Sequence, residues 1–252
     1  GGHLYVRNGK IAAISDDGTL PAREELDAAG LYVLPGMLDC HAHINDPGFT
    51  WREDLPHASE AAAVGGVTTL IDMPLQNTPP LTSADAFANK LAVFEGCSLV
   101  DYALWGGLVT DNTAELAGLD AAGAVGFKAF IAPVSLGYSS VDMGLAREAL
   151  FRIKAFGGLA GFHCEDHALI CAGEAKAKAG GGTRRAFLDS RPVVAEVIAT
   201  ANVIELARET GARVHICHVS HPRVAELVRR AQADGLSVTG ETCPHYLVFT
   251  EE

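Results

Sequence analysis

Short apolar runs alternate along this chain with longer segments of helical periodicity. The apolar runs are rich in Val, Ile and Leu, which is typical of strands that are buried on both faces. They occupy residues 33–38, 67–72, 100–108, 124–131, 159–163, 213–219 and 236–242. Helical periodicity covers residues 59–64, 83–95, 112–122, 143–156, 193–210 and 222–233, and residues 172–183 are expected to form an exposed helix that runs into a loop.

Glycines mark the joints between these segments. They stand where a predicted helix ends and the next strand begins, as left-handed C-cap residues do, at Gly65-Gly66, Gly123, Gly157-Gly158, Gly211 and Gly235. Strands and helices repeated in this order predict a parallel sheet. Because a (β/α)₈ barrel takes about 250 residues, we predict an α/β fold in which residues 33–252 form a TIM barrel with about seven of the eight units present.

The first thirty or so residues follow a different pattern. Two short alternating runs within residues 5–14 are joined by Asn8-Gly9, the strongest short-range signal of a β-hairpin. We therefore assign residues 1–32 to a small antiparallel element outside the barrel domain of residues 33–252. The chain begins Gly1-Gly2-His3, which is neither a signal peptide nor a natural start, so we expect the natural N-terminus to lie upstream.

The composition argues against several classes of partner. Hydrophobic residues make up 48% of the 252 residues, and the formal net charge is −12. Nucleic acids and anionic membranes attract Lys and Arg, so we expect neither as a partner. No apolar run approaches the roughly 20 residues that cross a bilayer. The six cysteines lack zinc-finger spacing, which indicates reduced thiols in a soluble, cytoplasmic protein.

His41 and His43 directly follow the first apolar run. Two imidazoles one residue apart on a strand point to the same side of it, so their nitrogens can converge on one divalent metal ion. The alternative for an isolated His-x-His is a pair of solvated loop histidines. The distribution of further candidate ligands along the chain decides between the two.

Those candidates stand near the ends of other predicted strands. Lys128 lies within residues 124–131, and His163 and His218 close the strands at 159–163 and 213–219. The carboxyl ends of barrel strands form one rim, which is where catalytic residues of this fold lie. We therefore predict a metal site at this rim. The remaining histidines are expected on the surface (His3, His57, His167, His221), in the core (His215), or at the site or its substrate (His245).

Lys128 needs a separate argument, because an ammonium group is a poor neighbour for a divalent cation. Burial between Phe127 and Phe130 favours the neutral amine, which can react with CO₂ to form a carbamate. A carbamate is a bidentate anion that can bridge two metal ions. The alternative is a lysine with a buried stem and a head group that reaches water at the strand end.

Together these segments resemble the cyclic amidohydrolases, a family of the amidohydrolase superfamily that includes allantoinase, hydantoinase (dihydropyrimidinase) and dihydroorotase. The resemblance covers nearly the whole chain. The motifs that carry it are residues 39–48 (DCHAHINDPG), 65–74 (GGVTTLIDMP), 126–128 (GFK), 163–165 (HCE) and 241–246 (ETCPHY).

The resemblance implies a TIM barrel joined to a small β-sandwich, which residues 1–32 would begin. It also implies two divalent metal ions as cofactors, zinc first, with cobalt, manganese or iron as alternatives. His41 and His43 would hold the more buried ion and His163 and His218 the more exposed one, with Lys128, carboxylated by CO₂, bridging them. The metals would ionise water and polarise a ring amide carbonyl. The expected partners are a small cyclic amide substrate and, in a homotetramer, further copies of the chain.

The resemblance further implies a general acid and base, which in this family is an aspartate at the end of strand 8. Asp189 and Asp234 are predicted on loops or helices and do not suit that role. We therefore expect the catalytic aspartate to lie beyond residue 252. On that reading the polypeptide as it stands is inactive.

A few positions separate the substrates of the family. Dihydroorotases typically carry Arg where this chain has Asn45 and Asn where it has Leu75, and hydantoinases usually carry Tyr at the position of Pro133. Allantoinases commonly carry Arg at the position of Phe49, but the other motifs look most like theirs. We therefore predict the opening of a hydantoin-type ring, allantoin to allantoate, with Asn45 and His245 as substrate contacts. Dihydroorotase and hydantoinase activity are the alternatives.

A non-catalytic scaffold is the alternative from a different functional class. Amidohydrolase-like proteins that have lost their metal ligands serve as assembly modules. This chain retains all five ligand positions that the resemblance implies, which favours the enzyme.

Overall fold

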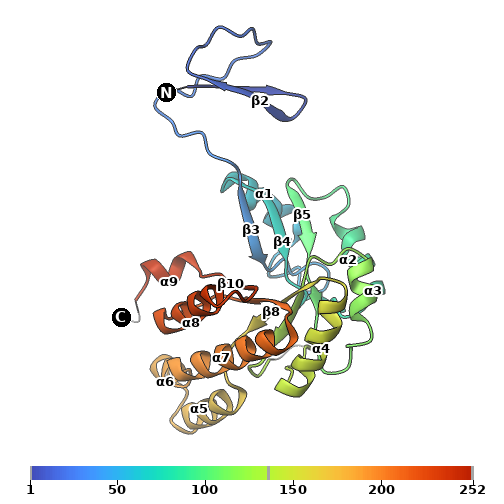
Figure 1. Cartoon of the computed structure of the whole chain (residues 1–252), viewed down its shortest axis with the longest axis vertical. Helices are drawn as coiled ribbons and strands as arrows, with labels where there is room; N and C mark the ends of the chain where they lie inside the picture. Colours follow the sequence, from blue (N-terminus) through green and yellow to red (C-terminus); the bar gives the residue numbers. More distant parts are fainter. Residues whose placement is uncertain (1, 135–136, 251–252) are drawn as a thin grey trace. The chain divides into compact units, whose positions relative to one another are not determined.

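The structure is a computed structural model that describes residues 2–134 and 137–250. The chain divides into two compact units, Gly1–Pro35 and Gly36–Glu252. This division lies three residues after the boundary expected from the sequence. Figure 1 shows the order of the elements along the chain.

The first unit contains the hairpin expected from Asn8-Gly9. Strands β1 (His3–Arg7) and β2 (Lys10–Ser15) pair antiparallel, with Arg7 opposite Lys10. Asn8 and Gly9 have φ angles of 52° and 71°. Two successive positive φ angles are what a two-residue turn of type I′ requires, and Asn and Gly adopt them at least cost.

The second unit is built on parallel strands. Their order is β3-β4-β5 in one sheet and β10-β9-β8-β7-β6 in the other. Only Trp105 separates β5 from β6, and its N–H donates to the carbonyl of Asp72 on β4 at 2.9 Å. The strands are β3 (Met37–Ala42), β4 (Val67–Asp72), β5 (Asp101–Leu104), β6 (Gly106–Gly107), β7 (Phe127–Phe130), β8 (Leu159–His163), β9 (Arg213–Ile216) and β10 (Val238–Gly240).

The prediction for the first of these strands was wrong by four residues. Residues 33–38 were expected, but β3 begins at Met37, whose N–H donates to the carbonyl of Gly66 at 3.0 Å. Pro35 has no N–H to give to a ladder and therefore stands outside the sheet. As a result His41 belongs to the strand itself, and His43 follows directly after it.

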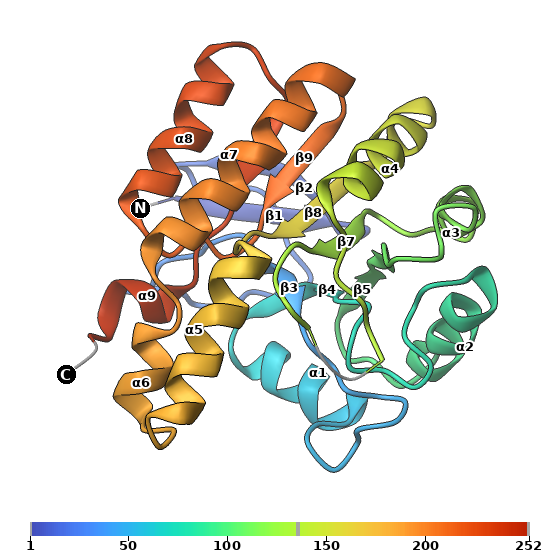
Figure 2. The ribbon, with the colours of Figure 1, turned by 90° about the horizontal axis from the view of Figure 1, so that it is seen from below.

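Helices surround these strands in the second unit (Figure 2). They are α1 (Leu55–Val64), α2 (Ala84–Phe94), α3 (Leu116–Ala121), α4 (Met143–Ala155), α5 (His167–Ala179), α6 (Arg184–Asp189), α7 (Val193–Thr210), α8 (Pro222–Ala233) and α9 (Pro244–Val248). Most lie close to the predicted segments.

Three helix starts differ from the sequence prediction because of side chains that bond to the backbone. The helix expected at residue 172 begins at His167, where Asp166 Oδ1 accepts from the N–H of Leu169 at 2.9 Å. The helix expected at residue 59 begins at Leu55, where Asp54 Oδ1 accepts from the N–H of His57 at 3.0 Å. The helix expected at residue 112 begins at Leu116. Asn112 instead holds the preceding loop, accepting from the N–H of Val109 at 2.9 Å and donating to the carbonyl of Gly107 at 2.7 Å.

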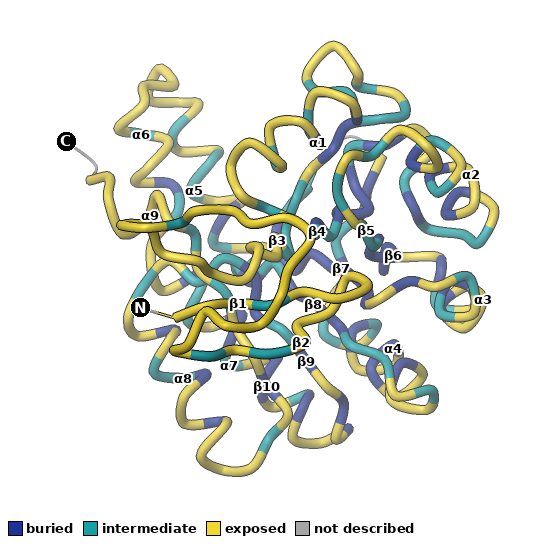
Figure 3. Tube along the Cα trace, turned by 90° about the horizontal axis from the view of Figure 1, so that it is seen from above, coloured by how far each residue is buried: buried dark blue, intermediate teal, exposed yellow. Residues whose placement is uncertain are grey.

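The two faces of the strands have different roles. In β7, Phe127 and Ala129 join the large apolar core that also contains side chains of α2, α4 and α7. Lys128 and Phe130 lie on the other face, where Phe130 packs with Met73, Trp105 and Tyr138. All four residues of β7 are buried, whereas the outer faces of the helices are largely exposed (Figure 3). The inner face is therefore the one that can carry a site.

Trp105 fills much of the space on this inner face. Its Nε1 donates to the carbonyl of Cys40 on β3 at 3.3 Å, and its ring centroid lies 6.5 Å from that of His215 on β9. Gly126 and Gly161 leave room for the ring, since a Cβ at either position would lie 2.5 Å or 3.0 Å from a ring atom. No helix in the described part of the chain is long and apolar enough to cross a membrane.

Gly126→Ala should therefore destabilise the second unit. A Cβ at 2.5 Å from Cζ3 of the rigid, buried Trp105 ring forces the ring or the strand to move. Overpacking of this kind costs about 1–3 kcal/mol of unfolding free energy, measured by urea titration. Gly118→Ala is the control, because its Cβ would meet no atom closer than 4.0 Å in helix α3. Equal unfolding free energies for the two variants would contradict the packing described.

Candidate metal centre

Four histidines come together where β3, β8 and β9 reach their carboxyl ends. His41 lies near the end of β3 and His43 follows the strand, His163 is the last residue of β8, and His218 comes two residues after β9. Ring centroids lie 5.2 Å apart for His41 and His43, and 5.5 Å apart for His41 and His218. The rings of His163 and His218 lie 4.6 Å apart. The four rings therefore form one continuous cluster.

Lys128 lies beside this cluster on the inner face of β7. The residue is 1% exposed, and its Nζ has no hydrogen-bond partner in the described part of the chain. Nζ lies 5.2 Å from the ring centroid of Phe130, which in turn stacks on His163 at 4.8 Å. The head group thus does not reach water, which removes the alternative of a snorkelling lysine. A buried amine without a partner is costly and calls for a chemical explanation.

Burial lowers the pKa of three of the imidazoles, those of His43, His163 and His218. Desolvation, aided by the nearby charge of Lys128, lowers the pKa of His218 to about 2. Desolvation also lowers the pKa of His163. Desolvation, followed by the charge of His41, lowers the pKa of His43 to about 3. Neutral imidazoles offer free lone pairs at ordinary pH, which is the protonation state that binds metal.

The backbone at His218 is unusual. Its φ angle is +38°, in the left-handed region that non-glycine residues rarely adopt. The N–H of the preceding residue, Cys217, still continues the sheet by donating to the carbonyl of Phe162 at 3.0 Å. The chain therefore turns sharply at the end of β9, and this turn brings the His218 ring to those of His41 and His163. Backbone strain of this kind occurs most often at functional sites.

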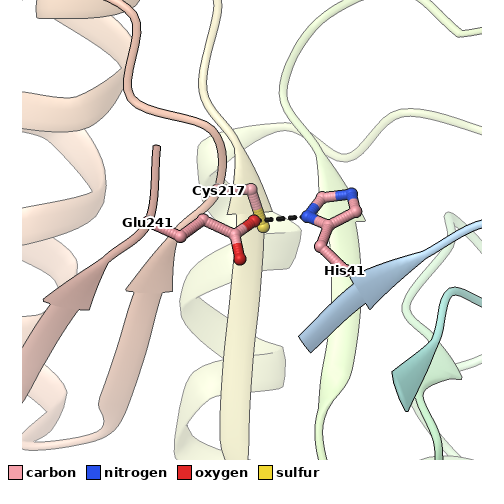
Figure 4. Close-up of side chains that lie close together, drawn as sticks. All are labelled: His41, Cys217 and Glu241. Atoms are coloured by element: carbon pink, nitrogen blue, oxygen red, sulfur yellow. Dashed lines mark hydrogen bonds and ion pairs between the residues drawn. The ribbon is translucent and has the colours of Figure 1, made fainter. Parts of the chain in front are cut away.

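Glu241 completes the cluster and was given no role in the sequence analysis. It follows β10 directly, and its carboxylate contacts Nδ1 of His41 (Figure 4). The other oxygen lies 3.3 Å from Nε2 of His215 and 3.4 Å from Sγ of Cys40. Burial raises the pKa of Glu241, but the hydrogen bonds from His215 and His41 lower it overall. The available signal was its place at the end of the seventh predicted strand, the same rule that found the histidines.

A second carboxylate holds His163. Glu165 Oε2 lies 2.6 Å from Nε2 of His163, and Arg191 Nη1 lies 3.2 Å from the same oxygen. Arg191 Nη2 also bonds Glu174 at 2.7 Å. Although burial raises the pKa of Glu165, the contacts with His163 and Arg191 keep it low. Glu165 therefore stays ionised beside the imidazole.

The two predicted substrate contacts differ in their setting. Asn45 is 5% exposed, its Nδ2 donates to the carbonyl of His43 at 3.4 Å, and its Oδ1 is buried without a partner in the described residues. His245 lies in α9 on the exposed surface, where its ring packs against Tyr246 at 4.5 Å. Within residues 2–134 and 137–250, we find no contact between His245 and the four clustered imidazoles.

The donor set at this rim suits a divalent transition metal. His41, Cys217 and Glu241 each offer one ligand atom, and these atoms lie within 4.8 Å of one another. Burial raises the pKa of the Cys217 thiol, so it is the weakest donor of the three. The neutral imidazoles and the buried amine of Lys128 surround this group. Nitrogen and oxygen donors of this kind are typical ligands of zinc and its neighbours in the transition series.

Replacing His218 should change how stability depends on pH in the metal-free protein. Its folded pKa of about 2 lies below the unfolded value of 6.5, so below pH 6.5 only the unfolded state binds the extra proton. The contribution of neutral His218 to the free energy of unfolding is therefore fully present above about pH 6.5, and it is lost as the pH falls. Between about pH 7 and pH 5 the loss due to His218 is about 2 kcal/mol, and His218→Asn should remove this share in urea titrations while the shares of His43 and His163 remain. His167→Asn, on the exposed surface of α5, should leave the parent pH dependence in place.

The family models identify the chain over most of its length. The model described as dihydro-orotase-like matches residues 30–223. Similar curated proteins include allantoinases of Streptomyces avermitilis, 40% identical over 252 residues, and of Deinococcus radiodurans, 38% identical over 251 residues. Each alignment covers 99% of this chain and 56% of the relative, so the chain spans about half the length of these proteins.

Solved structures give the same picture. The L-hydantoinase (dihydropyrimidinase) from Arthrobacter aurescens matches with a TM-score of 0.92 and 38% identity. That match covers 99% of this chain and 56% of the other. A D-hydantoinase matches with a TM-score of 0.86 and 31% identity, over 98% of this chain and 55% of that one. The extent of the family match, together with these relatives, shows that the chain belongs to the dihydro-orotase-like family of amidohydrolases with a TIM-barrel fold.

Proposed function

We propose that the protein containing this chain is a metal-dependent hydrolase that opens a cyclic amide of the hydantoin type, with allantoin to allantoate as the first candidate reaction. The observation that carries this proposal is the buried, unpartnered amine of Lys128 beside a cluster of four imidazoles, three of which have a pKa lowered by burial. The relatives named allantoinase support the choice of substrate.

The cofactors in this proposal are two divalent metal ions, zinc first, with cobalt, manganese or iron as alternatives. His41 and His43 would hold one ion and His163 and His218 the other. Nζ of Lys128 would add to CO₂ with loss of a proton, giving a carbamate that would offer the metal ions an anionic oxygen ligand. The metals would supply ionised water near neutral pH and polarisation of the amide carbonyl.

The surrounding side chains would prepare these ligands. Glu241 beside Nδ1 of His41 would leave Nε2 of that ring free, and the tautomer of a metal-binding histidine is commonly fixed in this way. Glu165 and Arg191 would orient His163 in the same manner. The unpartnered Oδ1 of Asn45 would accept a ring N–H of the substrate. We assign His245 to substrate contact as well, on the resemblance alone.

A second candidate is a hydantoinase or dihydropyrimidinase, favoured by the likeness to the L-hydantoinase. Dihydroorotase activity is less favoured, because Asn45 stands where an arginine would pair with the substrate carboxylate. Turnover of allantoin, hydantoin, dihydrouracil and dihydroorotate by the intact natural protein containing this chain would separate the candidates. Preference for dihydroorotate would contradict the role given to Asn45. We also propose a cytoplasmic homotetramer, which light scattering on the purified protein would test.

Lys128→Met should remove metal binding without unfolding the protein. Methionine keeps the length and most of the volume of the side chain but cannot form a carbamate, and it removes a buried amine that has no partner. We expect the variant to be at least as stable as the parent and to lose bound metal and ring-opening activity. Metal content would be measured by elemental analysis.

The matched control is Lys176→Met on the exposed face of α5, which should keep the parent metal content. Parent protein prepared with carbon-13-labelled bicarbonate should also show a carbamate carbon signal that Lys128→Met lacks. Unchanged metal content and activity in Lys128→Met would overturn the proposal. So would oligomerisation with no metal in the parent, which is the outcome expected of a scaffold.

A further inference from the structure

A buried ion pair lies directly behind the backbone that carries His43. Asp72 is the last residue of β4 and Lys90 lies in α2, and both side chains are 0% exposed. Asp72 Oδ2 and Lys90 Nζ lie 2.9 Å apart. Neither residue belongs to the candidate metal site, and neither touches an imidazole in the contacts described above. Contact with the metal ligands therefore does not explain why this ion pair is buried.

The pair holds Ile44, the residue after His43, by both of its backbone groups. Asp72 Oδ1 accepts from the N–H of Ile44 at 2.5 Å, and Lys90 Nζ donates to the carbonyl of Ile44 at 2.7 Å. On the other side of His43, the carbonyl of Ala42 accepts from the N–H of Met73 at 2.8 Å. The backbone on both sides of His43 is thus fixed to the end of β4.

The network closes through Asn77. Lys90 Nζ donates to Asn77 Oδ1 at 2.6 Å, and Asn77 Nδ2 donates to the carbonyls of Met73 at 3.3 Å and Leu75 at 3.1 Å. Asn77 is also buried, with 2% exposure. The ammonium of Lys90 therefore has three oxygen partners from three separate segments. An apolar side chain in place of Lys90 could fill the same space, but it could not hydrogen-bond to these segments and hold them together.

Stability alone does not explain an ion pair in this place. Burial raises the pKa of Asp72 to about 6 and lowers that of Lys90, so each group is ionised against a desolvation penalty that the other offsets. Buried ion pairs can often be exchanged for apolar residues without loss of stability. What an apolar pair would lose is the fixed position of Ile44, and with it the direction of the His43 side chain.

We propose that Lys90 is a positioning residue of the metal centre: with Asp72 it fixes the backbone of residues 42–45, so that the His43 ring and the Asn45 amide keep their places. The consequence for metal binding rests on the proposed function. The consequence for the His43 ring does not, because the hydrogen bonds to Ile44 join protein atoms alone.

The test is the double variant Asp72→Asn/Lys90→Met in the intact natural protein. Asparagine keeps an acceptor for the N–H of Ile44 and removes the charge that Lys90→Met would leave unpaired. We expect the metal-free double variant to stay folded with a lower urea midpoint than the parent, because the Ile44 carbonyl and Asn77 Oδ1 lose their donor. We expect zinc affinity, measured by competition with a chelator, to fall about 10- to 100-fold, as for other residues that orient metal ligands.

The ring proton and carbon signals of His43 give a second readout in the metal-free protein. They should shift or broaden in the double variant and stay unchanged in the control Lys176→Met. If the single variant Lys90→Met does not fold, the double variant, which leaves no unpaired charge, still supplies both readouts. Unchanged His43 signals together with unchanged zinc affinity would overturn the inference. A parent that binds no divalent metal refutes the proposed function, while the His43 signals still decide whether Lys90 positions the ring.

Discussion

The whole site depends on how the buried amine of Lys128 is accommodated among aromatic rings that give it no hydrogen bond. Lys128 stands on the inner face of β7 with no hydrogen-bond partner, beside imidazoles of which three have a pKa lowered by burial. A low dielectric setting strengthens every electrostatic interaction and makes any unpaired group expensive. The arrangement of the surrounding carboxylates is consistent with this constraint. Glu241 contacts His41 and Glu165 contacts His163, but neither bonds to Nζ of Lys128.

The two faces of the strands separate support from chemistry. Phe127 and Ala129 of β7 pack into the core beneath the helices, while Lys128 and Phe130 face inward with Trp105. The glycines on neighbouring strands admit the Trp105 ring and leave the carboxyl ends of β3, β8 and β9 to converge above it. Parallel strands thus bring residues far apart in the sequence, such as His41 and His218, into ring contact.

Much of this arrangement follows from periodicity and from the rule that side chains at strand ends share one rim. That rule found the histidines and Lys128, because each stands at or near the end of an apolar run. The same rule applies to Glu241. The sequence alone, however, does not show which side chain a single carboxylate will hydrogen-bond. The first strand was misplaced because apolar residues 33–34 continue the pattern while Pro35 breaks the ladder. Lys90 was beyond reach, since a lysine within a helical segment is normally solvated, and only tertiary contacts show its head group enclosed.

The positive φ angle of His218 has a consequence for the engineering of this fold. A histidine in the left-handed region costs free energy that glycine or asparagine would not, so this position favours ligand placement over folding. A glycine at this position would lower the conformational cost of the turn after β9 but would remove one imidazole from the cluster. Engineering this polypeptide for stability would therefore act against the placement of the His218 imidazole.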